Sequence, residues 1–283
     1  MKPLQPSRTA QGAAMHRAAH QLFDRPLVFE DALAIAIIGL EAEAELRCGQ
    51  DWHGHAAPGL RAFIVARSRL TEDLLAEAAG QGTRQYVVLG AGLDTYGYRQ
   101  SQGRPPLSIF EVDHPATQAW KRARLKEAGL TIPANVFHAP VDFERESLDA
   151  GLSRANFDFD EPAFVAWLGV TPYLSHDAVM ATLGFATSRL GKGSEIVFDY
   201  AEPVDDSDPS LRARFDALSA RVAKSGEPFR TFFDPETLAR EVNAFGFSEM
   251  HDWGALALNA RYFAGRNDGL RIPGRGHCLH ARV

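Results

Sequence analysis

The sequence predicts a single α/β domain built on a mostly parallel sheet of about seven strands, with a helical segment before the first strand. Short β-rich apolar runs alternate with longer segments whose apolar residues recur at helical spacing, a pattern typical of successive strand–helix units. A chain of 283 residues can bury one large core. Neither an internal repeat nor a low-complexity segment divides it.

The composition is that of an ordinary globular protein, with 45% hydrophobic and 23% charged residues. Thirty basic and 36 acidic side chains give a net charge of −6, which argues against nucleic acid as a partner. Only two cysteines occur, Cys48 and Cys278, so we expect no disulfide scaffold and a reducing compartment. The first twenty residues lack a signal-peptide core, and the most apolar stretch, residues 32–40, is far shorter than the roughly 20 residues that span a bilayer. These features predict a soluble, cytoplasmic protein without a membrane partner.

About eighty residues before the first strand have helical periodicity. The predicted helices are Ala13–Phe23, Phe29–Gly39 and Pro58–Ala79, the last ending at Gly80. Five strands then follow one another with helices between them. The strands are Gln85–Leu89, Leu107–Val112, Asn135–Ala139, Ala163–Leu168 and Glu195–Asp199, and the clearest helices are Pro115–Ala128 and Ser175–Leu190.

The last third of the chain begins with a polar insertion, Glu202–Phe233, that contains a predicted helix, Ser210–Lys224. An insertion of this length late in an α/β domain commonly forms part of a lid over a site. The remaining segments are a helix, Asp234–Phe245, with Asp234 as its N-cap and Pro235 in its first turn, and a closing antiparallel pair, Phe247–Trp253 and His277–Val283.

A buried strand leads directly into Gly90-Ala91-Gly92, where glycines allow a sharp turn and the close approach of a ligand. The alternative is a plain strand-to-loop turn. The next strand ends at Asp113, 21 residues beyond Gly92, where a carboxylate can accept hydrogen bonds from both hydroxyls of a ribose. A dinucleotide-binding loop would have a third glycine at position 95, which is Thr95. S-adenosylmethionine (SAM), which has no phosphate, therefore fits better than a dinucleotide.

Motifs along most of the chain resemble the leucine carboxyl methyltransferase superfamily, in particular its bacterial branch of SAM-dependent O-methyltransferases related to the tetracenomycin polyketide enzyme. The motifs are SRTA at Ser7–Ala10, ARSRLTEDLL at Ala66–Leu75, VVLGAGLDTYGYR at Val87–Arg99, FEVDHP at Phe110–Pro115 and WLGVTPYL at Trp167–Leu174. The combination of LGAGLDT and EVDHP at this spacing is specific to the family. The resemblance implies a Rossmann-like class I methyltransferase fold, with an N-terminal helical extension and a late lid insertion, and SAM as cofactor.

The resemblance also implies a set of cofactor-binding residues. Arg67 matches the arginine that holds the methionine carboxylate, Asp113 the acid that binds the ribose, and Asp142 the acid near the adenine. The full set is Arg67, Gly90, Ala91, Gly92, Asp113, Asp142, Phe143 and Leu168. Without the resemblance, Arg67 would be interpreted as a solvated helix charge and Val141-Asp142-Phe143 as an ordinary loop. For Asp113 the alternative is a helix N-cap ahead of Pro115, which is compatible with the ribose role.

One position departs from the family pattern. Leu168 stands where members often have glutamate, so we expect it to contact the cofactor by packing alone. This departure weakens the inference that the substrate is a leucine carboxylate, as it is in the eukaryotic branch of the family.

Methyl transfer from a sulfonium mainly requires alignment of the nucleophile, the methyl group and the leaving sulfur. A carboxylate acceptor, with a pKa of about 4, needs no base, whereas a phenol, with a pKa of about 10, would gain from one. Candidate bases near the motifs are His16, His20, His114 and His176, for each of which a structural role is the alternative, so no catalytic residue is assigned. Tyr173 and Tyr200 follow the fourth and fifth strands and could shape an acceptor pocket or pack in the core.

Two clusters, His53-Gly54-His55 and His277-Cys278-Leu279-His280, contain metal-ligand residue types, but neither has zinc spacing, and we predict no metal.

The predicted function is SAM-dependent O-methylation of a carboxylate or hydroxyl of a small molecule. The single domain would comprise a helical cap (residues 1–80), a cofactor-binding core (85–200), the lid insertion (202–233) and the C-terminal part of the sheet (234–283). The alternatives are an NAD(P)-dependent oxidoreductase and a non-catalytic SAM-binding partner protein.

Overall fold

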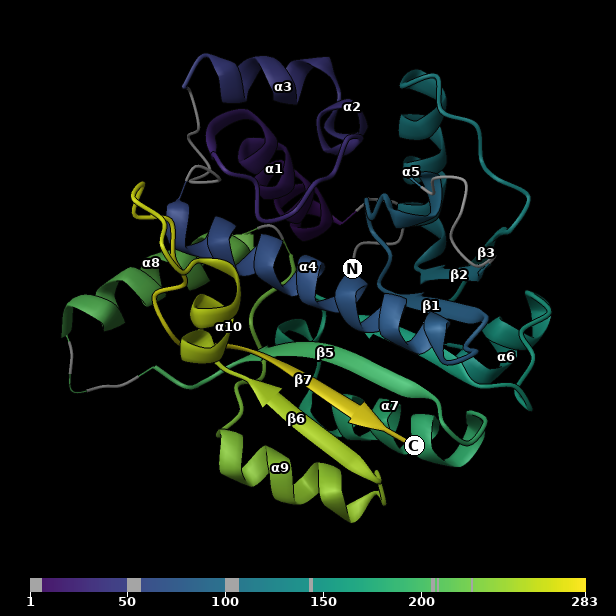
Figure 1. The fold of residues 1–283 in the computed structure, drawn as a ribbon. Coiled ribbons are helices and arrows are strands. Elements are labelled where there is room, and N and C mark those ends of the chain that lie inside the picture. Colours follow the sequence, from purple (N-terminus) through teal and green to yellow (C-terminus); the bar gives the residue numbers. More distant parts are fainter. Residues whose placement is uncertain are drawn as a thin grey trace.

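The computed structural model describes residues 7–49, 57–99, 107–142, 145–204, 207, 209–224 and 226–283. Its centre is one seven-stranded sheet with the order β3-β2-β1-β4-β5-β7-β6 (Figure 1). Strands β1 to β5 pair in parallel, and β7 runs antiparallel to both β5 and β6. The strands are β1 (Gln85–Leu89), β2 (Ser108–Asp113), β3 (Val136–Pro140), β4 (Ala163–Trp167), β5 (Glu195–Ala201), β6 (Glu249–Trp253) and β7 (Gly276–Arg282). The predicted mostly parallel sheet with a closing antiparallel pair is confirmed.

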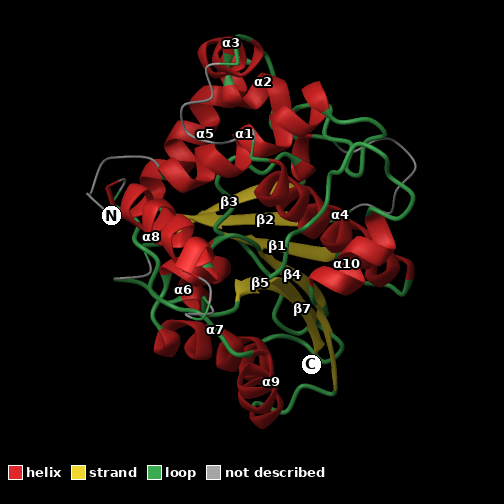
Figure 2. Cartoon of the chain, turned by 90° about the vertical axis from the view of Figure 1, so that its left-hand side faces the viewer, coloured by secondary structure: helices red, strands yellow, loops and turns green. Residues whose placement is uncertain are grey.

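Helices pack on both faces of the sheet (Figure 2). They are α1 (Arg8–Phe23), α2 (Ala34–Ile38), α3 (Leu40–Arg47), α4 (Pro58–Gly80), α5 (Pro115–Glu127), α6 (Leu148–Arg154), α7 (His176–Arg189), α8 (Pro209–Lys224), α9 (Pro235–Ala244) and α10 (Ala255–Tyr262). Helices α4 and α10 contribute to the core on one face, and α6, α7 and α9 to the core on the other. The N-terminal helices α1 to α3 form a third apolar cluster, together with Leu93 and Leu125.

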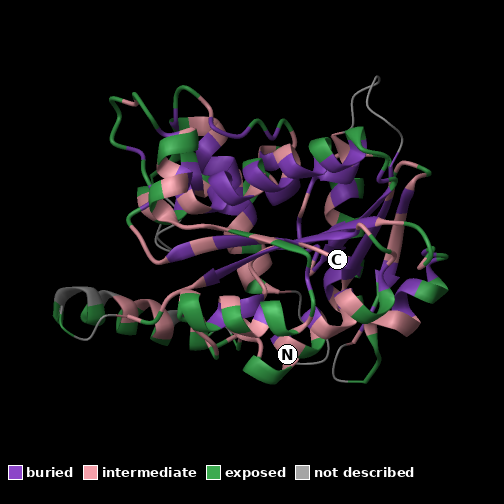
Figure 3. Ribbon diagram, turned by 60° about the horizontal axis from the view of Figure 1, so that its bottom comes forward, coloured by how far each residue is buried: buried purple, intermediate pink, exposed green. Residues whose placement is uncertain are grey.

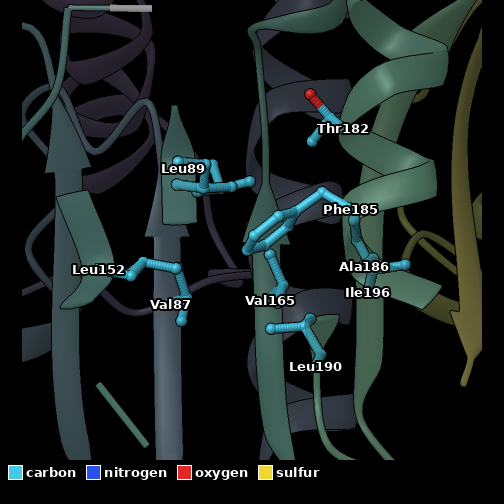
Figure 4. Close-up of a pocket in the computed structure, with 10 residues that line it drawn as sticks. Val87, Leu89, Leu152, Val165, Thr182, Phe185, Ala186, Leu190 and Ile196 are labelled. Atoms are coloured by element: carbon cyan, nitrogen blue, oxygen red, sulfur yellow. The ribbon is translucent and has the colours of Figure 1, made fainter. Parts of the chain in front are cut away.

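Strand β1 shows why the predicted strands form. All five of its residues are buried, since Val87 and Leu89 face the α6–α7 side while Tyr86 and Val88 face α4. A strand covered on both faces appears in sequence as a continuous apolar run. Figure 3 shows this buried layer of strands between helices whose outer surfaces are exposed. Figure 4 shows a small cavity on the α6–α7 face, whose lining is apolar apart from Thr182 and which belongs to the core.

The predicted helix Phe29–Gly39 is wrong in extent. Only Ala34–Ile38 is helical, and α3 follows after a break at Gly39, whose φ of +85° ends the first helix. The residues before α2 form a turn in which the Asp31 carboxylate accepts a hydrogen bond from Leu33 N at 3.2 Å. Helices α3, α6 and α10 were not predicted, because each has eight residues or fewer and too few turns for a clear period. The expected N-cap of α9 is confirmed, since Asp234 Oδ1 accepts from Thr237 N at 2.9 Å.

A buried ionic cluster around Asp31 joins the N-terminal helices to the loop that follows β1. The Asp31 carboxylate accepts hydrogen bonds from Arg17 Nε at 3.1 Å and Thr95 Oγ1 at 2.8 Å, and it lies 3.2 Å from Arg99 Nε. Arg17 also donates to Leu93 O at 2.6 Å. The cap is therefore fastened to the glycine-containing loop by directional bonds as well as by apolar packing.

Within the described residues, none of the helices combines the length and the apolar character needed to cross a bilayer. Both cysteines are free thiols, with Cys48 exposed and Cys278 buried.

Replacing Asp31 with alanine should lower the free energy of unfolding by about 3–5 kcal/mol, because Arg17 would lose the charge that compensates it in a buried site and Arg99 would keep only its pair with Glu72. Urea denaturation monitored by circular dichroism measures this change. The control is Arg47→Ala, which removes the exposed Glu43–Arg47 pair and should change stability by about 0.5 kcal/mol or less. A loss below about 1 kcal/mol for the Asp31 variant would contradict the role assigned to this cluster.

Candidate functional site

The candidate site lies where the carboxyl ends of β2, β1, β4 and β5 meet at one edge of the sheet. In open α/β sheets, ligands bind at this edge. The loops after β1 and β4, together with the end of β2, supply most of the predicted site residues. The first turn of α1 reaches the same edge.

The loop after β1 depends on its two glycines. Gly90 has φ +69° and Gly92 has φ +44°, in the left-handed region that favours glycine. A Cβ atom on Gly90 would lie 2.4 Å from Val170 Cγ2, and one on Gly92 would lie 2.8 Å from Ala10 Cβ. The β4 loop and α1 therefore pack directly against this backbone, which is a closer approach than a plain turn requires.

Asp113 joins the end of β2 to this loop. Its Oδ2 accepts a hydrogen bond from Gly92 N at 2.6 Å, and its Oδ1 accepts one from His114 N at 2.7 Å. Burial raises the pKa of Asp113 above its ordinary value, against the opposing effect of these two backbone donors. Each oxygen keeps lone-pair capacity for a further donor. The N-cap of α5 is His114, whose Nδ1 accepts from Ala116 N at 3.2 Å, so the interpretation of Asp113 as a cap is wrong.

Asp142 follows β3 at the same edge. The preceding residue, Val141, donates its N–H to Asp113 O at 2.9 Å and so aligns the loop after β3 with the end of β2. The Asp142 carboxylate forms an ion pair with Arg145 at 3.5 Å. Phe143, predicted beside it, lies outside the described residues.

Arg67 is not the solvated helix charge that its position alone suggested. It is 8% exposed, and its Nη1 donates to Oδ2 of Asp199 on β5. Asp199 Oδ1 also accepts from Gly169 N at 2.5 Å. Asp199 was not predicted, although an acid at the carboxyl end of the fifth strand is the same kind of feature that identified Asp113. Leu168 packs against the apolar core on the α4 side, as expected for a side chain without a polar contact.

The late insertion begins and ends at one point of the sheet. Phe233 N donates to Ala201 O at 3.0 Å, and Glu202 N donates to Arg275 O at 2.9 Å. Between these ends, Arg230 N donates to Pro172 O at 2.7 Å, and Glu227 Oε2 accepts from Thr9 N in the first turn of α1 at 3.1 Å. The insertion therefore contacts both the β4 loop and the N-terminal cap beside the candidate site.

Four partly buried aromatic rings cluster where the insertion meets the β4 loop. Tyr173 stacks on Phe229 with ring centroids 5.5 Å apart, and Phe215 and Phe232 complete the cluster. The guanidinium of Arg275 lies 5.3 Å from the Phe215 ring. Burial raises the pKa of Tyr173 to about 12, with Arg67 opposing this rise. An amphipathic aromatic surface of this kind suits a planar organic ligand.

A second, polar cluster lies at the ends of β5, β6 and β7 and was not predicted. Tyr200 Oη donates to Asp252 Oδ2 at 2.7 Å, and His277 lies between two carboxylates. Its Nδ1 is 3.0 Å from Asp252 Oδ2, and its Nε2 is 2.5 Å from Glu202 Oε1. Sequence reasoning considered His277 only as a metal ligand, because its partners Glu202 and Asp252 are distant in sequence.

The four histidines proposed as bases have different surroundings. His20 is fully buried, with Nδ1 2.7 Å from Asp24 Oδ2 and Nε2 accepting from Val28 N at 3.0 Å. His114 caps α5, and His176 is exposed and lies 3.1 Å from Glu241. His16 is buried on α1. Two of the four therefore have defined structural roles.

The two sequence clusters that contain metal-ligand residue types have separate outcomes. His53 and His55 lie outside the described residues. His280 forms an ion pair with Glu195 at 2.6 Å. In the part of the chain that the structure describes, no group of three or more His, Cys, Asp or Glu side chains is arranged to hold a metal ion.

Comparison with known proteins adds to this geometry. The sequence model of the family described as leucine carboxyl methyltransferase matches residues 10–187. The Bacillus subtilis protein named "Putative S-adenosyl-L-methionine-dependent methyltransferase YktD" is 29% identical over 309 aligned residues, covering 99% of each chain. A Mycolicibacterium smegmatis protein also named as such a methyltransferase is 34% identical, over 67% of this chain and 62% of its own length.

Solved structures share the fold. A crystal structure titled as a putative methyltransferase from Thermobifida fusca aligns with a TM-score of 0.59 and 21% identity, over 98% of this chain and 95% of that one. A DUF574 family protein from Streptomyces avermitilis aligns with a TM-score of 0.56 and 16% identity, over 87% and 94% of the two chains. At these identities the likeness concerns the fold alone.

The His277 cluster should make stability depend on pH. Burial disfavours the charged imidazolium, but the hydrogen bonds to Asp252 and Glu202 outweigh this effect and raise the pKa of His277 above 6.5. A histidine whose pKa is raised on folding stabilises the fold fully below its unfolded-state pKa and loses this effect as pH rises through the folded-state pKa. The melting temperature of the wild type should therefore fall, relative to that of His277→Gln, as pH rises from 6 to about 9. If the melting temperatures of these two proteins change with pH in parallel, the prediction is contradicted. The control is a substitution at an exposed histidine, His251→Gln, whose pH profile should run parallel to that of the wild type.

Proposed function

Because the chain belongs to the leucine carboxyl methyltransferase family, we propose that it is an O-methyltransferase acting on a carboxylate or hydroxyl group of a small molecule, with a place in secondary metabolism. The protein is a SAM-dependent methyltransferase with a Rossmann-like fold, since the family model spans most of the chain and a relative named as such a methyltransferase aligns over 99% of both chains. The acceptor class and the residues that bind the cofactor belong to the proposal.

One observation carries the proposal. The hydrogen bond between Asp113 and Gly92 N brings the acid after β2 against the glycine loop after β1, so one ligand can contact both. An adenosyl group offers two ribose hydroxyl donors for the remaining lone pairs of Asp113, and it needs no phosphate cradle at Thr95. Thr95 Oγ1 instead donates to Asp31 Oδ2 at 2.8 Å, and so takes part in fastening the cap.

The chain's residues fit SAM at several points. The positive φ of Gly90 and Gly92 keeps backbone close to the ligand position, and Arg67 Nε is a buried donor without a hydrogen-bond partner among the described residues. We assign the methionine carboxylate to Arg67, the ribose to Asp113, the adenine to the Asp142–Phe143 segment and packing contacts to Leu168. Gly90, Ala91 and Gly92 complete the proposed set.

SAM supplies a methyl group that its sulfonium already activates for displacement. The protein must therefore hold the acceptor oxygen in line with that group and keep water away, and precise alignment accounts for much of such a rate enhancement. The insertion is placed for the second task, because it contacts both α1 and the β4 loop beside the site. A carboxylate acceptor would need no proton acceptor from the chain.

Acceptor choice is proposed to lie with the N-terminal helices and the insertion. The aromatic cluster of Tyr173, Phe215, Phe229 and Phe232 adjoins the edge, and the polar cluster around His277 lies at the base of the insertion. These groups favour a small organic acceptor with an oxygen nucleophile. The domain then comprises a cap at residues 1–80, a cofactor-binding core at 85–200, the lid insertion at 202–233 and the C-terminal part of the sheet at 234–283.

The first test compares SAM with NAD by thermal shift. A ligand that binds only the folded state raises the melting temperature, and at 100 times its dissociation constant it adds about 2.7 kcal/mol to stability. We expect SAM and S-adenosylhomocysteine to raise the melting temperature and NAD to leave it unchanged. Stabilisation by NAD alone would favour an oxidoreductase and reject the proposal.

The second test is Asp113→Ala, which should weaken SAM binding by about 1–3 kcal/mol through the loss of charge-assisted hydrogen bonds. Isothermal titration calorimetry on the folded variant measures this loss. Asp149→Ala removes an exposed carboxylate paired with Arg189 and should keep wild-type affinity. Unchanged SAM affinity in the Asp113 variant would refute its assignment to the ribose.

A further inference from the structure

Asp199 connects three segments of the carboxyl edge. It lies near the end of β5 and is 2% exposed. Its Oδ2 accepts from Arg67 Nη1 on α4, and its Oδ1 accepts from Gly169 N in the β4 loop at 2.5 Å. Its backbone oxygen accepts from Thr171 Oγ1, two residues further along the same loop. One buried residue therefore determines where α4 and the β4 loop lie relative to β5.

The ion pair with Asp199 leaves one part of Arg67 available. A guanidinium presents parallel N–H pairs along two edges, Nη1–Nη2 and Nε–Nη2, and either pair matches the two oxygens of a carboxylate. Asp199 binds Nη1. Nε is buried and has no hydrogen-bond partner among the described residues. Because buried N–H groups are nearly always paired, this donor indicates a position where a ligand completes the site.

The β4 loop approaches the Nη2 end of Arg67 closely because residue 169 has no side chain. Gly169 has φ +72°, and a Cβ atom there would lie 2.8 Å from Arg67 Nη2. The next residue, Val170, has its Cγ2 against Gly90 of the loop after β1. Gly169 therefore contacts Arg67, and the next residue of the β4 loop, Val170, contacts Gly90 of the glycine loop. Because these two residues are adjacent, one ligand can contact both the guanidinium and the glycine loop.

We propose that Asp199 is a positioning residue of the cofactor site, which holds Arg67 by Nη1 so that its Nε–Nη2 edge receives the carboxylate of the cofactor's amino acid group. This inference rests on the proposed function. Asp199 acts through Arg67 and Gly169 and does not itself touch the ligand. An arginine without this partner would keep its charge, but the direction of its donors would no longer be set, and bidentate binding depends on that direction.

Two ligands separate this role from a general structural one. S-adenosylhomocysteine has the amino acid group, whereas 5′-methylthioadenosine has the same adenosine and sulfur but no amino acid group. Isothermal titration calorimetry with both ligands should show that Asp199→Asn weakens S-adenosylhomocysteine binding about tenfold or more, the size expected for a lost charge-assisted contact. The affinity for 5′-methylthioadenosine should change less than about threefold, because the proposed adenosine contacts do not involve Asp199.

The matched control is Asp24→Asn. Asp24 is also buried and also pairs with an arginine of α4, accepting from Arg61 Nε at 2.7 Å and Nη2 at 2.8 Å. This variant should lose stability to a similar degree and leave the affinities for both ligands unchanged. If Asp199→Asn does not fold, Asp199→Glu provides the same test, because glutamate keeps the charge beside Arg67 but moves the carboxylate by one methylene and so changes the direction of the Arg67 donors.

The outcomes are distinguishable. A loss confined to S-adenosylhomocysteine supports the positioning role. An equal loss for both ligands, or unchanged S-adenosylhomocysteine affinity in a folded variant, would overturn it while leaving the proposed function intact. A wild-type protein that binds neither ligand would instead overturn the proposed function, and this inference with it.

Discussion

The hydrogen bond from Gly92 N to Asp113 is the constraint on which the rest of the site depends. It closes the loop after β1 against the end of β2, and the loop can reach that position only because Gly90 and Gly92 adopt left-handed φ values. With the loop in place, Ala10 of α1 and Val170 of the β4 loop pack directly on its backbone. A side chain at either glycine would displace one of these neighbours, so the loop after β1, the cap and the β4 loop have to be built together.

The fold could be predicted from the sequence largely because the sheet is parallel and covered on both faces. Each buried strand, such as Gln85–Leu89, is then a continuous apolar run, and the long helices between strands have a clear period. The break at Gly39 and the short helices α3, α6 and α10 escaped prediction, because a helix of one or two turns depends more on its tertiary neighbours than on its own pattern.

The candidate site was predictable only in part. Gly90, Gly92 and Asp113 belong to local patterns at strand ends, and the structure brings these residues together. The partner of Arg67 could not be predicted in the same way, because Asp199 lies 132 residues away in the sequence and contacts Arg67 only in the folded sheet. The polar contacts of His277 were missed for the same reason, since its carboxylate partners come from other strands and loops. Sequence patterns identify which residues stand at the edge, whereas the pairing among them is a property of the tertiary structure.

The two faces of the sheet differ in how they are held together, and the difference bears on function. The core on the α6–α7 face is built from apolar side chains. The opposite face also contains buried ion pairs, among them Arg17–Asp31, Arg61–Asp24 and Lys121–Glu111, which lies at 2.8 Å with both side chains 1% exposed. Buried pairs of this kind add little net stability compared with apolar packing, but they require one geometry, whereas apolar surfaces tolerate small shifts. We infer that the bonds joining Asp31 to Arg99 and Thr95, together with the bond from Arg17 to Leu93 O, set the register of the cap on the loop after β1. A shift of the cap would carry Ala10 away from Gly92 and Thr9 away from Glu227, and so would open the glycine loop and release the insertion together. In this view the charges beneath the cap serve the site by keeping its separate segments aligned.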